Sequence, residues 1–189
     1  MLNCMSKFMS RRVLIPLVLL MATAVAALGL YLFQPWRIFT SSTATEGLPS
    51  FAPTPIPSSE SAGDSAPAPT PLAPRELVSG ELISHEHASS GSVRILELPD
   101  GSRILRFEGL DTSDGPDLKV WLSDAPVIEG TAGWHVFDDG AYLSLGALKA
   151  SKGDQNYEIP AGTVLGDYSS VSIWCARFAV SFAAAELRM

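Results

Sequence analysis

The feature that most constrains this chain is an uninterrupted apolar run near its start. Residues 13–33 read VLIPLVLLMATAVAALGLYLF, which is 21 residues without a charge. As a helix that rises about 1.5 Å per residue, the run is about 30 Å long and matches the hydrocarbon core of a bilayer. Lys7, Arg11 and Arg12 precede it, so the positive-inside rule predicts a cytoplasmic N-terminus at residues 1–12. The sequence therefore predicts a single-pass cell-membrane protein that contacts the lipid bilayer through residues 13–33 and has an extracytoplasmic C-terminal domain.

A cleaved signal peptide is the alternative interpretation of the same segment. Small residues around positions 22–27 are compatible with a cleavage site. The apolar run continues to Phe33, however, which is long for such a peptide. The sequence favours an uncleaved signal-anchor.

Residues 34–74 have the composition of a spacer. They are rich in Ser, Thr, Ala, Pro and Gly, and eight prolines fall between Pro49 and Pro74. Such a segment has too little apolar surface to offset its ordering entropy. We expect a disordered linker between the anchor and the rest of the chain.

Residues 75–189 have the size of one domain and an acidic balance. They hold 17 acidic and 9 basic residues, a net charge of −8. Nucleic-acid binding draws most of its affinity from basic groups that neutralise phosphates, so no nucleic-acid partner is expected. No Gly-x-Ser-x-Gly, His-Glu-x-x-His, P-loop or dinucleotide motif is present, which favours an accessory or binding domain over an independent enzyme.

The pattern of this domain is that of strands. VRILEL and SRILRFE flank Pro99-Asp100-Gly101, a strong hairpin signal, and in DLKVWLS apolar residues alternate with others. Helical periodicity is weak after residue 33. The predicted fold class is all-β, an antiparallel β-sandwich or barrel-like domain, preceded by one transmembrane helix and the disordered linker.

Four motifs in this domain carry a resemblance to a known family. They are HEHASSG (85–91), SDGPDLKVWLS (113–123), KGDQNYEIP (152–160) and VSIWCARFAVSF (171–182). In this order and spacing they resemble the DM-thirteen domain, which occurs beside DOMON domains in Skeletor-like proteins and alone behind membrane anchors in bacteria. The resemblance implies a membrane-tethered electron-transfer module whose cysteine, here Cys175, is redox-active, with an envelope protein or redox partner.

Two interpretations of Cys175 stay open at this point. Cys4 lies on the other side of the predicted membrane and cannot pair with it, so Cys175 is a single exported thiol. Alternation along VSIWC places it on the face of Val171 and Ile173, which favours a buried structural cysteine. The family resemblance favours a redox thiol. The sequence identifies no cofactor, although a metal or haem is compatible with the redox interpretation.

Six further residues are considered for supporting roles. His87 falls where the family pattern has its histidine, and Asp117 follows the SDGP turn; both are candidate metal ligands. His85 lies two residues before His87, on the same face if the segment is a strand. Trp174 and Tyr157, together with Trp121, are candidates for an aromatic path toward Cys175.

Two alternative functions compete with electron transfer. One is a non-catalytic binding module of the cell envelope, with Cys175 simply buried. The other is a calcium-stabilised β domain, since Asp111, Asp114 and Asp117 offer oxygen ligands near a tight turn. Local capping of backbone N–H groups is the commoner role of such aspartates.

Overall fold

The computed structural model describes residues 11–33, 41–49 and 73–189 of the 189-residue chain, and it divides into two compact units. The first unit contributes one helix, α1 (Arg11–Phe33), with exposed apolar side chains along Ile15–Tyr31. Among the described residues no helix is both long enough and apolar enough to cross a bilayer, so the transmembrane helix predicted over residues 13–33 is not supported.

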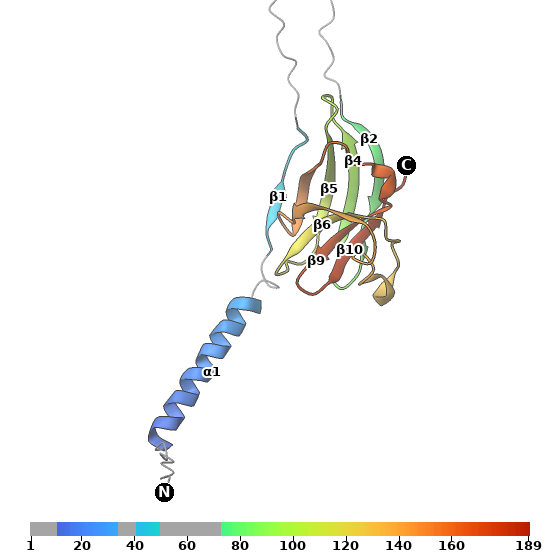
Figure 1. Cartoon of the computed structure of the whole chain (residues 1–189). Helices are drawn as coiled ribbons and strands as arrows, with labels where there is room; N and C mark the ends of the chain where they lie inside the picture. Colours follow the sequence, from blue (N-terminus) through green and yellow to red (C-terminus); the bar gives the residue numbers. More distant parts are fainter. Residues whose placement is uncertain (1–10, 34–40, 50–72) are drawn as a thin grey trace, which may run out of the picture. The chain divides into compact units, whose positions relative to one another are not determined.

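The second unit is a sandwich of two β-sheets (Figure 1). The first sheet has the order β1–β8–β5–β4–β2, with bounds Thr43–Thr45, Lys152–Ile159, Arg103–Asp111, Ser90–Glu97 and Arg75–Glu81. The second has the order β3–β10–β9–β6–β7, with bounds Ile83–Ser84, Val180–Glu186, Ser170–Cys175, Leu118–Ser123 and Tyr142–Ala147. Two short 3-10 helices, η2 (Gly130–Gly133) and η3 (Leu165–Asp167), lie in the loops.

Strand pairing is antiparallel except between β1 and β8. The hairpin predicted at Pro99-Asp100-Gly101 joins β4 and β5, and Gly101 takes the positive φ of 83° that the turn requires. The side chain of Asp100 accepts a hydrogen bond of 2.9 Å from the backbone N–H of Ser102. The predicted mostly β, sandwich-type fold is thus confirmed.

The main core is built from alternate residues of both sheets. In β6, Leu118, Val120 and Leu122 belong to it, as the alternation of DLKVWLS predicted. Corresponding positions of other strands complete it: Val93 and Ile95, Leu105 and Phe107, Val171 and Ile173. These side chains are buried because the strands that carry them present one apolar face to the opposite sheet.

A second apolar cluster covers the other face of the second sheet. Trp121 of β6 and Trp174 of β9 lie there with Phe137, Ala125 and Ala184. Phe137 and Ala125 come from the long β6–β7 connection, so this connection covers the sheet. As a result β9 is buried on both faces along its whole length.

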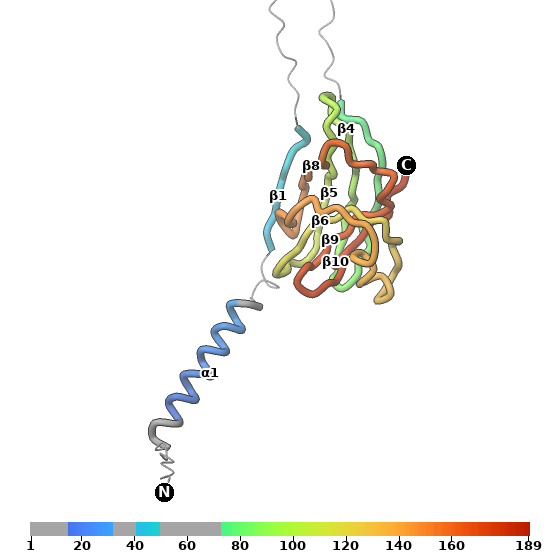
Figure 2. Tube along the Cα trace, in the orientation of Figure 1, coloured from blue at the N-terminus to red at the C-terminus, as the bar shows by residue number. Residues whose placement is uncertain are grey.

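The structure differs from the predicted linker at residues 41–49. Thr43–Thr45 form β1, which runs parallel to β8 and lies beside it in Figure 2. Gly153 of β8 has φ of 90°, and a Cβ there would collide with the backbone carbonyl of Ala44. The strand is short and polar, so composition does not reveal it: its backbone completes an open sheet edge instead of burying side chains. Linker residues 50–72 lie outside the described residues.

Candidate functional site

Cys175 is the last residue of β9, and its side chain lies inside the main core. Its register partners are Leu118 of β6 and Val180 of β10. The residue is 0% exposed and is a free cysteine. It shares the main core cluster with Val171 and Ile173, as the alternation along VSIWC predicted. Cys4 lies outside the described residues.

The electrostatics of the Cys175 thiol are set by burial. Burial raises the pKa of the thiol because it disfavours the charged thiolate. Backbone N–H groups of Phe178, Arg177 and Asp117 oppose this shift, and the charge of Glu86 adds to it. The net shift is upward. At neutral pH the group is therefore a protonated thiol, and the nucleophilic thiolate is scarce.

The turn between β9 and β10 holds the backbone around Cys175 in place. The N–H of Ala176 donates to the carbonyl of Asp117 at 3.0 Å, which ties the turn to the SDGPD loop. Ala179 adopts a left-handed φ of 49°, a conformation that costs a residue with a Cβ on the order of 1–3 kcal/mol. Its carbonyl accepts a 2.6 Å hydrogen bond from Nδ1 of His135, which helps to maintain that conformation.

The histidine motif lies against β10. Backbone N–H groups of His85 and Glu86 donate to the carbonyls of Phe182 and Ser181, at 3.0 and 3.2 Å. The ring of His87 packs on that of Phe182, with centroids 4.0 Å apart. Motifs from residues 85–91, 113–123 and 171–182 therefore meet at the Cys175 end of the second sheet. The fourth motif forms β8 in the first sheet.

This gathering of motifs agrees with a family-level match. The family model described as Electron transfer DM13 matches residues 81–187, more than half of the chain. The chain belongs to the electron transfer DM13 family. The match runs from the last residue of β2 to just beyond β10 and includes every residue around Cys175. The chain has no match among curated proteins and none among solved structures.

The DM13 domain brings His87 and Asp117 to the same end of the sandwich as Cys175, but each side chain has another partner. The Asp117 carboxylate pairs with Nζ of Lys119 at 2.9 Å, and Nε2 of His87 lies 3.6 Å from the Glu86 carboxylate. In the part of the chain that the structure describes, no group of three or more His, Cys, Asp or Glu residues could hold a metal ion. Ligation of a metal or haem by Cys175 does not fit this geometry, because its sulfur lies inside the apolar core.

The three aspartates proposed for calcium are also engaged separately. Asp111 pairs with Lys152 at 2.7 Å, and Asp114 accepts a hydrogen bond from the N–H of Gly115 at 2.9 Å. With Asp117 paired to Lys119, their oxygen atoms do not converge on one point. Their contacts are those of local capping and surface ion pairs.

The three aromatic residues proposed for the path toward Cys175 lie in two different places. Trp174 follows the parity of β9 onto the opposite face from Cys175, where it stacks on Trp121 with centroids 5.0 Å apart. Tyr157 lies in β8 of the first sheet, and its hydroxyl donates to Oε1 of Gln155 at 2.7 Å. Burial raises the pKa of Tyr157 to about 12. Trp174 and Trp121 thus stack on each other on the face opposite Cys175, whereas Tyr157 lies in the main core that also contains Cys175.

Sequence reasoning missed Tyr142 of β7. Its ring stacks on Trp121 with centroids 3.9 Å apart and an interplanar angle of 10°. The β6–β7 register pairs Trp121 with Ser144, which makes Tyr142 a diagonal neighbour on the same face. A sequence signal for this contact exists only once the register of that hairpin is known.

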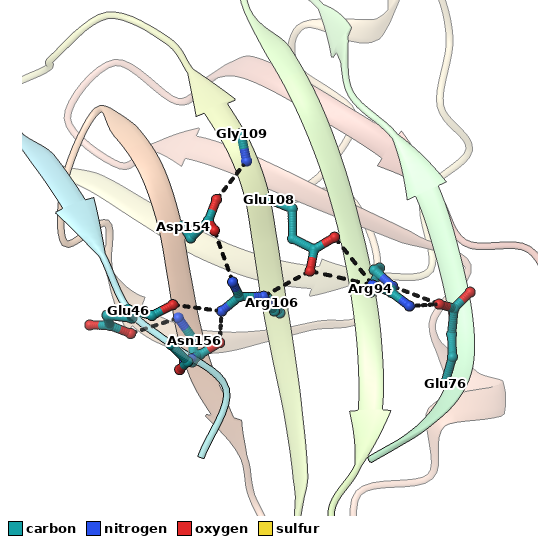
Figure 3. A network of polar contacts seen from close by, with 9 residues as sticks. Glu46, Glu76, Arg94, Arg106, Glu108, Gly109, Asp154 and Asn156 are labelled. Atoms are coloured by element: carbon teal, nitrogen blue, oxygen red, sulfur yellow. Dashed lines mark hydrogen bonds and ion pairs between the residues drawn. The ribbon is translucent and has the colours of Figure 1, made fainter. Parts of the chain in front are cut away.

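A charged network covers the outer face of the first sheet (Figure 3). Arg106, whose side chain is 7% exposed, donates to the carboxylates of Glu108 and Asp154 at 2.9 Å. It also donates to the side-chain oxygen of Asn156 at 2.9 Å and to the backbone carbonyl of Glu46 at 2.8 Å. These contacts satisfy the hydrogen-bonding groups of the guanidinium. The contact with Glu46, which directly follows β1, also joins that segment to the sheet.

Proposed function

We propose that this DM13 domain transfers single electrons and that Cys175 is the group that is oxidised and reduced. The observation that carries the proposal is the convergence of three family motifs around one buried thiol. The family description supports electron transfer as the class of function. The burial of the thiol favours electron transfer over thiol–disulfide exchange, because exchange requires a partner thiolate to reach the sulfur.

The chemistry at Cys175 follows from its protonation state. Since burial raises the pKa of the thiol, one-electron oxidation at neutral pH releases one electron to an acceptor and one proton to solvent. The product is a sulfur-centred radical, and reduction takes up one electron and one proton. The midpoint potential is expected to fall by about 59 mV per pH unit below the thiol pKa and to become pH-independent above it.

The test is a mediated redox titration of the full chain carrying Cys4→Ser, which leaves Cys175 as its one thiol. We expect a one-electron, pH-dependent transition that Cys175→Ala abolishes. Ile173→Val is the matched control, because it perturbs the same strand and core but keeps the sulfur. The same transition in the Cys175→Ala protein would disprove the proposal.

The complete burial of Cys175 also supports a second candidate, a non-catalytic binding module with a structural cysteine. A cavity of about 540 Å³ lined by Gly80, Glu81, Val127 and Glu186 among others offers one place for a ligand or envelope protein. This candidate predicts that Cys175→Ala leaves partner binding intact, while Val127→Asp in the cavity wall abolishes it.

We also propose that residues 13–33 hold the chain at a lipid bilayer, with the N-terminus cytoplasmic and the β domain extracytoplasmic. Its support is the uncharged sequence and the exposed apolar side chains of α1. Membrane fractionation with alkaline extraction, followed by protease accessibility, tests both parts. A freely soluble product that starts downstream of residue 33 would instead indicate a cleaved signal peptide, and a protease-protected domain in intact cells would reverse the orientation.

A further inference from the structure

Three aromatic rings form a continuous stack from the surface to the centre of the second sheet. Tyr142 is 46% exposed, Trp121 is 7% exposed and Trp174 is 1% exposed. The two contacts along the stack have centroid separations of 3.9 and 5.0 Å and interplanar angles of 10° and 22°. We infer that this stack is the electron port of the domain: a one-electron acceptor docks at Tyr142, and electrons reach it through Trp121 and Trp174. The inference rests on the proposed electron-transfer function and names its route.

The sheet fixes the spacing of the three rings. They come from adjacent strands β7, β6 and β9, and each contact joins diagonal positions in the strand register. Backbone hydrogen bonds on both sides therefore hold the rings in van der Waals contact. Electronic coupling decreases steeply with separation, so direct contact between rings gives a shorter tunnelling step than any gap filled by aliphatic side chains.

The surroundings of Trp121 suit a group that is oxidised reversibly. Its indole Nε1–H is buried and has no hydrogen-bond partner among the described residues. After loss of an electron, an indole without a neighbouring base or water keeps its proton as a radical cation. Phe137, which is fully buried, packs edge-on against Trp174 with centroids 6.4 Å apart and helps to exclude water.

The route connects to Cys175 through the chain itself. Trp174 and Cys175 are consecutive in β9, with Cα atoms about 3.8 Å apart, although their side chains lie on opposite faces. The acceptor takes one electron from Trp121. Trp174 then donates one electron to the oxidised Trp121, and the Cys175 thiol donates one electron to the oxidised Trp174. The sum is one reduced acceptor, one sulfur-centred radical and one proton released to solvent. Bonds between heavy atoms neither form nor break.

Aromatic side chains on sheets usually serve packing, so the test must separate electron flow from stability. Tris(bipyridine)ruthenium(III), generated by a laser flash with a sacrificial quencher, is the acceptor, and the full chain with Cys4→Ser is the donor. Transient absorption follows the decay of the acceptor and the appearance of the tryptophan radical cation. Trp121→Phe keeps an apolar ring in the stack and removes the oxidisable indole.

We expect Trp121→Phe to slow electron transfer at least about tenfold, which corresponds to about 1.4 kcal/mol of added barrier. Trp134→Phe is the matched control. Trp134 is also an indole whose Nε1 has no hydrogen-bond partner among the described residues, but it packs against the main core and does not belong to the stack. Its rate is expected to stay within about twofold of the parent rate, which corresponds to about 0.4 kcal/mol. Tyr142→Leu provides a second test at an exposed position, where misfolding is not expected, and it should also slow the reaction.

The outcomes distinguish the route from the redox group. An unchanged rate in both Trp121→Phe and Tyr142→Leu would overturn the port, and the proposed role of Cys175 would stand if Cys175→Ala still abolished the sulfur radical. A slowed rate in the stack variants together with a parent-like final spectrum in Cys175→Ala would support the port and overturn the role of Cys175.

Discussion

The outer faces of the two sheets differ in whether their polar groups have hydrogen-bond partners. On the first sheet, Arg94 and Arg106 stand directly opposite each other, and the Glu108 carboxylate bridges the two like charges at 3.2 and 2.9 Å. On the second sheet, aromatic rings cover the face, and Nε1 of Trp121 is buried without a hydrogen-bond partner in the described residues. Fully paired groups serve stability, whereas unpaired buried groups require another explanation. The comparison therefore directs functional tests to the second sheet.

The largest expected effect is the loss of an aromatic ring from the second sheet. Trp174→Ala removes a ring that is 1% exposed, and such truncations cost about 3–5 kcal/mol because they leave a cavity. Urea unfolding measures the loss. Tyr142→Ala at the exposed end of the stack is the control, with an expected loss of about 0.5–1.5 kcal/mol. Equal losses for the two variants would show that the inner part of the cluster does not stabilise the domain more than its rim.

A smaller effect is expected on the charged face of the first sheet. Arg106→Met keeps the apolar stem and removes the guanidinium, so Glu108, Asp154 and Asn156 each lose one hydrogen-bond donor. We expect a loss of about 1–3 kcal/mol. Hydrogen exchange should report faster exchange in Thr43–Thr45, because the backbone carbonyl of Glu46 loses its contact with Arg106.

Arg75→Met is the matched control for that prediction. Arg75 also pairs with a glutamate, Glu97, but its side chain is 71% exposed. Exposed pairs contribute less than about 1 kcal/mol. If Arg75→Met destabilised the domain as much as Arg106→Met, the paired network would not differ from an ordinary surface ion pair.

Much of the fold follows from local sequence patterns. Alternation placed Leu118, Val120 and Leu122 in the core and Cys175 among aliphatic side chains, because strand periodicity is a local property. The turn at Asp100-Gly101 was predictable from its dihedral requirement. Strand β1 was not, since two threonines and one alanine carry no periodic signal. They are held by the edge of β8, more than a hundred residues away in the chain.

The site was predictable only in part, because contacts between segments distant in the chain leave no local sequence signal. The WC motif and the parity of β9 indicated Cys175 and the opposite side for Trp174. The contact of Tyr142 with Trp121 depends on the β6–β7 register, which includes a shift between Val120 and Trp121 that no local pattern specifies. The charged partners of His87 and Asp117 are their sequence neighbours Glu86 and Lys119. The packing of the His87 ring on Phe182, by contrast, depends on how distant segments of the chain meet.

The smallest predicted effect is a difference between the two faces in how they make the free energy of unfolding depend on pH. On the second sheet, burial lowers the pKa of His85, whose Nδ1 lies 2.8 Å from Oγ of Ser181. A lowered pKa of a base means that the unfolded chain binds the proton more readily, so this contribution to stability is present above pH 6.5 and is lost as the pH falls below it. On the first sheet, the hydrogen bond from Lys149 lowers the pKa of Glu46, so its contribution is lost only below about pH 4.5.

Urea unfolding at a series of pH values between 7.5 and 5 separates the two contributions. One proton changes the unfolding free energy by no more than about 1.4 kcal/mol per pH unit, and His85→Asn should remove that slope while an amide nitrogen remains near the position of Nδ1. The exposed His135 provides the control, since His135→Asn should leave the slope in place. A slope that persists in His85→Asn would assign the titration to another group and remove the distinction between the two faces near neutral pH. Its loss in His85→Asn alone would place the acid-sensitive point of the domain in the aromatic face, beside the electron port.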